Sequence, residues 1–291
     1  MTAFLTVQEA VSRYVGDGDA IYLAGFTHLI PFAFGHEIIR QRRRHLTLCR
    51  ATPDLVYDQM IAAGVADTLV FSYAGNPGVG LLQAFRRAVE HGELALEEYT
   101  HFELVARLAA GAADLPFWPL RSLDSDLSAR RPRPRVKSPF GPEEVAVVPA
   151  LRPDVTLVHA HCADEMGNIY AWGLLGEVRE AALAARRVLV SVEEVRPGDG
   201  LRAERDHLLL PAFRVESVSV APWGAHPSYV HGVYDRDTAA YTEWDRISRD
   251  AGATSEWLDA FVHGVPDRAG YLSLLQPERL RALKEAAEHG A

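Results

Sequence analysis

Between Thr6 and Ala112, short apolar runs alternate with helical patterns, and this alternation constrains the fold more than any other feature of the sequence. The run Ala20 to Ala24 is apolar throughout, ends at Gly25 and precedes a helical pattern at Pro31 to Arg42. Uninterrupted apolar strands that take turns with helices are typical of βαβ units, in which helices cover both faces of a parallel sheet. The sequence therefore predicts an α/β fold with a mainly parallel sheet. Further strands are expected at Leu46 to Cys49, Thr68 to Tyr73 and Leu94 to Tyr99.

Two of the expected helices begin with a capping box, in which an N-cap threonine precedes a glutamate by three residues. The pairs are Thr6 with Glu9 and Thr100 with Glu103. Helices are also expected at 55–63 and 81–90. For the helix that follows Thr100, the expected buried face comprises Phe102, Val105, Leu108, Ala109 and Ala112.

The alternation breaks between Pro116 and Pro153, where only Glu144 to Val148 has the pattern of a strand. We expect this excursion at 116–153 to be an irregular, solvated or subunit-facing loop and not a linker, so that residues 1–291 form one domain with a helical C-terminal tail. The α/β pattern resumes with strands at Val155 to Ala160, Ile169 to Trp172 and Val188 to Val192, a helix at Glu177 to Arg186, and amphipathic helices after Trp223 that end with Leu280 to Glu288.

The composition excludes several classes of function. The 30 basic and 39 acidic side chains give a net charge of −9, which argues against nucleic acid or an anionic membrane as the main partner. No apolar run reaches the roughly 18 residues of a membrane span, and the N-terminus lacks the pattern of a signal peptide. Cys49 and Cys162 are not in C-x-x-C spacing and are expected to be free thiols. A cytoplasmic protein is expected.

Two glycine-bearing loops follow expected strands, where ligands bind in doubly wound sheets. Gly25, Phe26 and Thr27 follow the first strand, but their spacing does not match G-x-G-x-x-G, and a structural turn glycine is an equal alternative. The loop that contains Ser72 and Asn76 lacks the lysine of a P-loop. Its two side chains can donate hydrogen bonds to a carboxylate or thioester oxygen, although a plain connecting loop is equally expected.

Three further groups of polar residues have competing interpretations. His101 lies at a strand-to-helix junction, where it either orients an anion or is a structural histidine. Glu103 is expected to cap its helix more readily than to act as a catalytic carboxylate. The segment His159 to Asn168 is rich in metal-capable side chains, but a zinc site needs converging ligands and usually a distant second pair, so no metal is expected. Its last residues are expected to form a tight turn with positive φ at Gly167 or Asn168.

Several segments, in order along the chain, resemble family I coenzyme A transferases. Arg152 to Asn168 resembles a strand and turn common to that family, Gly25 and Phe26 with Pro31 resemble its N-terminal glycine motif, and Ala221 to Pro227 resembles a loop near the end of its first subunit. Ala24 departs from a glycine that the motif often has. The segments Tyr99 to Phe102 and Leu115 to Ser122 look most like the A subunit of glutaconate CoA-transferase.

This resemblance implies an open αβα sandwich with a mainly parallel sheet, and a heteromeric enzyme whose A and B subunits share an active site. It implies transfer of CoA from an acyl-CoA to a carboxylic or dicarboxylic acid through a glutamyl-CoA thioester, with CoA as a substrate and no permanently bound cofactor. The family's nucleophilic glutamate lies in a Ser-Glu-Asn-Gly motif of the B subunit. Glu103, Glu193 and Glu194 lack that context, so the chain alone is expected to be inactive and its B-subunit partner to supply the glutamate.

By the same resemblance, this chain would line the acyl pocket with six residues: Gly25, Phe26, Thr27, Ser72, Asn76 and His101. A close alternative is the A subunit of a ring-cleaving acyl-CoA hydrolase of steroid catabolism, in which Glu103 would be catalytic. An alternative of another class is a non-catalytic scaffold subunit that only binds acyl-CoA.

Overall fold

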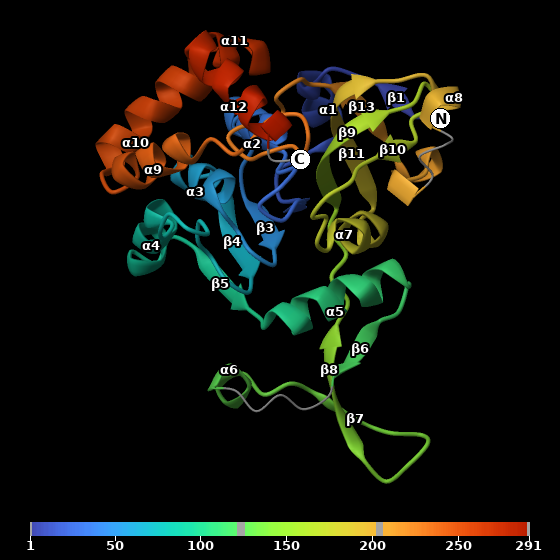
Figure 1. Ribbon diagram of the computed structural model, residues 1–291. Helices are drawn as coiled ribbons and strands as arrows, with labels where there is room; N and C mark the ends of the chain where they lie inside the picture. The colour runs from blue at the N-terminus through green and yellow to red at the C-terminus, as the bar shows by residue number, and fades with distance from the viewer. Residues whose placement is uncertain (1, 121–125, 202–205, 290–291) are drawn as a thin grey trace.

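The structure is a computed structural model that describes residues 2–120, 126–201 and 206–289. At its centre lies a row of strands in the order β1-β13-β11-β9-β2-β3-β4-β5, and every neighbouring pair in the row is parallel (Figure 1). The predicted mainly parallel α/β fold is therefore confirmed. The strands of the row are β1 (Ala3–Phe4), β2 (Ala20–Leu23), β3 (Leu46–Arg50), β4 (Ala66–Phe71), β5 (Ala95–Glu98), β9 (Val155–Ala163), β11 (Arg187–Val195) and β13 (Ser217–Val220).

The helices expected between the strands are all present. Thr6 caps the first of them with the predicted capping box, and Gly167 has a φ of 89° in the predicted turn before β10 (Ile169–Tyr170). The sequence did not indicate β1, β13 or the short strand β12 (Leu208–Leu210), which pairs with β10. The helices are α1 (Val7–Tyr14), α2 (Phe32–Arg40), α3 (Leu55–Ala62), α4 (Gln83–Glu90), α5 (His101–Ala112), α7 (Val178–Ala184) and α8 (Gly198–Leu201).

The C-terminal part of the chain is helical, as expected, and lies beside α2 and α3 (Figure 1). The Trp244 indole N–H in α9 donates a 2.8 Å hydrogen bond to Asp58 in α3, which joins this layer to the body of the protein. Within the described residues, none of the helices is both long and apolar enough to cross a bilayer. The elements are α9 (Thr238–Ile247), α10 (Ala251–Leu258), a π-helix (Asp259–His263), α11 (Arg268–Ser273) and α12 (Pro277–His289).

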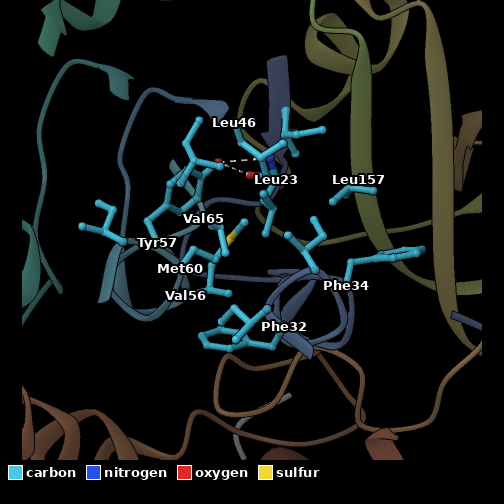
Figure 2. Close-up of a cluster of buried hydrophobic side chains, with 14 of the residues drawn as sticks. Leu23, Phe32, Phe34, Leu46, Val56, Tyr57, Met60, Val65 and Leu157 are labelled. Atoms are coloured by element: carbon cyan, nitrogen blue, oxygen red, sulfur yellow. Dashed lines mark hydrogen bonds between the residues drawn. The ribbon is translucent and has the colours of Figure 1, made fainter. Parts of the chain in front are cut away.

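A buried cluster packs α2 and α3 against the strands in the middle of the row (Figure 2). Phe34 of α2 and Met60 of α3 pack with Leu23 of β2 and Leu157 of β9 in this cluster. The Tyr57 hydroxyl accepts from the Leu23 N–H at 3.0 Å, so the cluster also contains a satisfied polar group. All nine residues of β9 are buried, as expected for a strand covered by helices on both faces.

The excursion contains more regular structure than the sequence indicated, and the expectation of a single strand there is wrong. Strands β6 (Phe117–Leu120), β8 (Glu144–Pro149) and β7 (Arg135–Lys137) form an antiparallel sheet that extends away from the central sheet below α5 (Figure 1). A short helix, α6 (Asp126–Arg130), lies between β6 and β7, and residues 121–125 are outside the described ranges. Both missed strands are edge strands, where proline and charge are tolerated.

The expected buried face of α5 is only partly correct, since Leu108 is buried as expected but other positions differ. Phe102 is 53% exposed, whereas Leu104, Ala106, Ala110 and Gly111 are buried. The helix packs closely against α7, and small side chains permit this approach. A Cβ placed on Gly111 would lie 2.4 Å from the Leu151 carbonyl oxygen.

We therefore predict that Gly111→Ala destabilises the protein by about 1–3 kcal/mol, because overpacking forces the backbone to move. In an open helix the same change stabilises by about 0.5–1 kcal/mol. Gly200→Ala is the matched control, since beyond its own helix no atom of the described residues lies within 4 Å of the added Cβ. Denaturant unfolding of both variants measures the difference, and a stabilised Gly111→Ala protein would contradict the packing argument.

Candidate active site

The strand order places a topological switch point between β2 and β9. From β2 the chain proceeds outward through β3, β4 and β5, and from β9 it proceeds outward in the opposite direction through β11 and β13. Ligands bind in doubly wound sheets outside the carboxyl ends of the strands at such a point. Since these strands are parallel, the loops that follow β2, β3, β4 and β5 all lie along this edge of the sheet.

The loop after β2 has a strained backbone. Gly25, Thr27 and Leu29 have φ values of 109°, 56° and 54°. Such a conformation costs of order 1–3 kcal/mol at each non-glycine residue and persists only when surrounding groups impose it. A Cβ at Gly25 would lie 2.6 Å from the His28 carbonyl oxygen, so only glycine fits there.

Distant segments impose this conformation. Arg50, at the end of β3, donates a 2.7 Å hydrogen bond to the Gly25 carbonyl oxygen. The Ser228 hydroxyl donates to the Thr27 carbonyl oxygen at 2.9 Å, and the Leu29 N–H donates to the Tyr229 carbonyl oxygen. Phe26 and Thr27 are nevertheless half-exposed, and within the described residues neither N–H has a hydrogen-bond acceptor. These N–H groups are free to bind an oxygen of a ligand.

Ser72 and His101, both singled out from the sequence, are in direct contact. Ser72 Oγ lies 2.6 Å from His101 Nδ1, and Thr52 Oγ1 lies 2.8 Å from His101 Nε2. The imidazole is thus held between two hydroxyl groups, which follow β4 and β3. Sequence reasoning missed Thr52, although it lies two residues after β3, on the same edge as the other two.

Asn76 lies in the same loop as Ser72, and its side chain is buried. Within the described residues, neither its Oδ1 nor its Nδ2 has a hydrogen-bond partner. The Gly75 N–H donates to the Pro53 carbonyl oxygen, which joins this loop to the one that contains Thr52. No described hydrogen bond joins Asn76 to His101 or to the loop at Gly25.

Glu103 forms the predicted capping box with Thr100 and an ion pair with the excursion. Its carboxylate accepts from the Thr100 N–H at 2.8 Å and from two guanidinium nitrogens of Arg133, at 2.6 and 3.0 Å. Burial raises the pKa of Glu103, but the hydrogen bonds from Arg133 and Thr100 outweigh it and lower the pKa below its usual value. The ionised carboxylate is thereby held on its own helix.

A second carboxylate, that of the half-buried Glu193 in β11, was considered in the sequence only as a nucleophile. It accepts hydrogen bonds from His159 Nε2 at 2.8 Å, the Tyr234 hydroxyl at 2.7 Å and the Trp223 N–H at 2.8 Å. Burial raises its pKa, whereas the hydrogen bonds, that of His159 foremost, produce a net lowering. Glu194 pairs with Arg196.

His159 and His161 do not converge on a metal-like cluster. His161 stacks on Trp172 with ring centroids 3.6 Å apart, and its Nε2 lies 3.0 Å from the His231 carbonyl oxygen. Across residues 2–120, 126–201 and 206–289, no group of three metal-capable side chains is placed to bind an ion. Cys49 and Cys162 are buried, and no disulfide joins them.

Comparisons with known proteins agree with this architecture. A family model described as coenzyme A transferase matches residues 4–221. The chain is 48% identical to the A chain of 3-oxoadipate CoA-transferase from Pseudomonas knackmussii, over 92% of this chain and 96% of the relative. It is 30% identical to the corresponding chain of glutaconate CoA-transferase from Acidaminococcus fermentans, over 98% of this chain and 95% of that one.

The crystal structure of the Acidaminococcus fermentans enzyme superimposes with a TM-score of 0.93 at 28% identity, covering 97% of this chain and 96% of that one. A cholesterol ring-cleaving hydrolase IpdA subunit of Rhodococcus jostii is 29% identical over 86% of this chain and 90% of its own.

The Glu103 ion pair predicts a pH-dependent stability. Because the folded-state pKa of Glu103 is lowered, its contribution is present above the unfolded-state value of about 4.3 and is lost as the pH falls through the folded-state value. Glu103→Gln should lower the free energy of unfolding by about 1–3 kcal/mol near neutral pH, since a charged hydrogen bond is lost. This difference should shrink as the pH is lowered below about 4.

Urea unfolding at a series of pH values measures this effect. Glu90→Gln, which removes an exposed glutamate at 4.0 Å from Arg86, is the matched control and should differ little from the unmodified protein at any pH. If the free energy of unfolding lost in Glu103→Gln does not change with pH, the ion pair is not the source of that loss.

Proposed function

We propose that this chain, which belongs to the coenzyme A transferase family, is the A subunit of an enzyme that moves CoA between an acyl-CoA and a dicarboxylic acid. The observation that carries this proposal is the strained loop at Gly25 to Leu29. It presents two N–H groups that have no acceptor among the described residues, at the switch point of the sheet, where a thioester oxygen could be bound. The names of both transferase relatives, 3-oxoadipate and glutaconate, refer to dicarboxylates.

The proposed reaction proceeds through a covalent enzyme intermediate. A glutamate carboxylate oxygen bonds to the thioester carbon and the C–S bond breaks, giving an acyl-glutamyl anhydride and CoA thiolate. The thiolate then attacks the glutamyl carbonyl carbon, the acyl group leaves as a free carboxylate, and CoA is held as a glutamyl thioester. The acceptor carboxylate reverses these steps, so atoms and charge balance and CoA is a substrate throughout.

We propose that the glutamate comes from a B-subunit partner. The three glutamates of this chain that the sequence raised as candidates are each engaged, Glu103 with Arg133, Glu193 with His159 and Glu194 with Arg196. A carboxylate held by such partners is a poor nucleophile, because bond formation would require those hydrogen bonds to break. This chain would then contribute the pocket that binds the acyl group and the acceptor acid.

Within that pocket, the residues have separate roles. The N–H groups of Phe26 and Thr27 would bind the oxyanion that forms on the thioester carbonyl. A hydroxyl of Thr52 or Ser72 that accepts from the His101 imidazole would donate a hydrogen bond to a carboxylate of the acceptor acid. The side-chain amide of Asn76 has no hydrogen-bond partner among the described residues, which supports a ligand-binding role for Asn76 in the loop that also contains Ser72.

The principal alternative is hydrolysis, because an IpdA subunit of a ring-cleaving hydrolase is also a relative. In that function Glu103 would have to face the substrate, whereas its ion pair with Arg133 and its capping box favour CoA transfer. A non-catalytic subunit that only binds acyl-CoA is the remaining alternative, since it also requires no glutamate in this chain.

The first test is to purify the chain, alone or together with its co-expressed B subunit, for assays of CoA exchange among short dicarboxylates and their CoA thioesters. We expect exchange only with both subunits present, with a glutamyl-CoA adduct on the partner detected by mass spectrometry. Exchange by the chain alone would refute the role of the partner. Hydrolysis without exchange by the pair would instead establish the hydrolase.

A second prediction concerns the acceptor acid. His101→Asn and Ser72→Ala should each raise the KM for the acceptor dicarboxylate by about tenfold or more, since hydrogen bonds to a charged group contribute about 1.5–3 kcal/mol. The KM for the acyl-CoA should change less. His91→Asn, which alters an exposed histidine after α4, is the control. An unchanged acceptor KM in both variants would place the carboxylate elsewhere.

A further inference from the structure

Arg50 is a charged side chain in an unusual place. It is the largest of the fully buried side chains in the described residues, with 1% of its surface exposed. Its Nη2 lies 2.7 Å from the Gly25 carbonyl oxygen, its Nη1 lies 3.3 Å from Asp54, and its guanidinium lies 5.5 Å from the centre of the Tyr57 ring. Its Nε has no partner within the described residues.

A contribution to the stability of the fold does not by itself explain why Arg50 and Asp54 are buried together. Burying an ion pair removes two charges from water, and replacing such a pair by apolar side chains is often neutral or stabilising. The Arg50 and Asp54 charges are separated by 3.3 Å, and the guanidinium makes its shortest hydrogen bond with a backbone carbonyl instead. The position of the charge therefore points to a role in the loop at Gly25.

The geometry of one peptide unit connects Arg50 to the edge of the sheet. In a trans peptide, the C=O and the N–H lie in one plane and point in opposite directions. Because Arg50 binds the Gly25 carbonyl oxygen from the interior, the Phe26 N–H of the same peptide must point away from the interior. This agrees with the half-exposed position of Phe26 and with the absence of an acceptor for its N–H within the described residues.

We propose that Arg50 is a positioning residue for the reaction, which holds and polarises the Gly25–Phe26 peptide so that the Phe26 N–H stabilises the oxyanion of the thioester. This proposal rests on the function proposed above. When the glutamate oxygen bonds to the thioester carbon, an electron pair moves onto the carbonyl oxygen, and it returns when the C–S bond breaks. A cation on the far side of the peptide strengthens the N–H as a donor, because hydrogen bonds in a chain polarise one another.

The Arg50 guanidinium stays protonated in the interior. Burial by itself lowers the pKa of Arg50, but the Asp54 carboxylate and the surrounding groups outweigh it and raise the pKa above its usual value. The guanidinium is therefore charged near neutral pH. The Ser228 hydroxyl, which binds the Thr27 carbonyl oxygen, orients a neighbouring peptide of the same loop without a charge.

The test compares variants of Arg50 in the complex of this chain with its B subunit. Arg50→Met with Asp54→Asn removes both charges together, so no unpaired charge is left in the interior. We expect kcat to fall by about 10- to 100-fold, because a single oxyanion donor contributes about 10²- to 10³-fold and the peptide is loosened, not deleted. The KM for the acyl-CoA should change less than about threefold, since the interaction forms only in the transition state.

Arg50→Lys keeps the charge but lacks the planar fork that reaches both the carbonyl and Asp54. Arg50→Lys should retain a higher kcat than the double variant Arg50→Met with Asp54→Asn. If the double variant does not fold, Arg50→Lys alone tests the positioning role. In that case, a kcat lowered by at least about fivefold at an unchanged KM supports the proposal, and an unchanged kcat overturns it.

Arg214→Lys is the matched control, because this arginine also binds backbone carbonyls, those of Ala182 and Ala185, at the opposite edge of the sheet. Its kcat should equal that of the unmodified complex. If the unmodified complex transfers no CoA, the proposed function fails. If the unmodified complex transfers CoA, the double variant tests the role of Arg50 separately. That role fails if the kcat of the double variant stays within about twofold of the unmodified value, or if its KM for the acyl-CoA rises as much as its kcat falls.

Discussion

The parallel pairing of β9 with β2 is the interaction on which the rest of the structure depends. Leu23 lies beside Leu157 in this register, while the other edge of β9 pairs with β11 along nearly its whole length. One buried strand thus joins the two halves of the chain and creates the switch point of the sheet. The loop at Gly25, the network at Glu193 and the hydroxyl groups around His101 all lie at or after the carboxyl ends of strands in this row.

The sequence predicted the central strands of this sheet, from β11 to β4, because a strand covered on both faces must be apolar along its whole length, but it missed β1 and β13 at one end of the row. It predicted the excursion and α5 poorly for physical reasons. Strands β6 and β7 form only by pairing with β8, and nothing local in a segment of prolines and arginines indicates a partner. In α5 the buried face is marked by small residues such as Ala110 and Gly111, since the distance between helices is decided there by the absence of bulk.

The candidate site was predictable only in part. Ser72 and His101 were found because ends of parallel strands meet at one edge of a sheet. Arg50 was not considered, because the sequence does not distinguish a buried arginine from an exposed one. Only the structure shows that the Arg50 guanidinium contacts a backbone carbonyl. Glu193 was examined as a nucleophile, but its three donors come from distant positions that periodicity cannot connect.

The segment that fixes the strained loop lies far along the chain. Ser228 contacts the carbonyl of Thr27 across a sequence separation of 201 residues, and it lies beyond residue 221, where the match to the family model ends. During synthesis, the sheet around β2 can therefore assemble long before this loop acquires its final shape. The segment that completes this loop is thus synthesised only after every strand of the central row, since β13 ends at Val220.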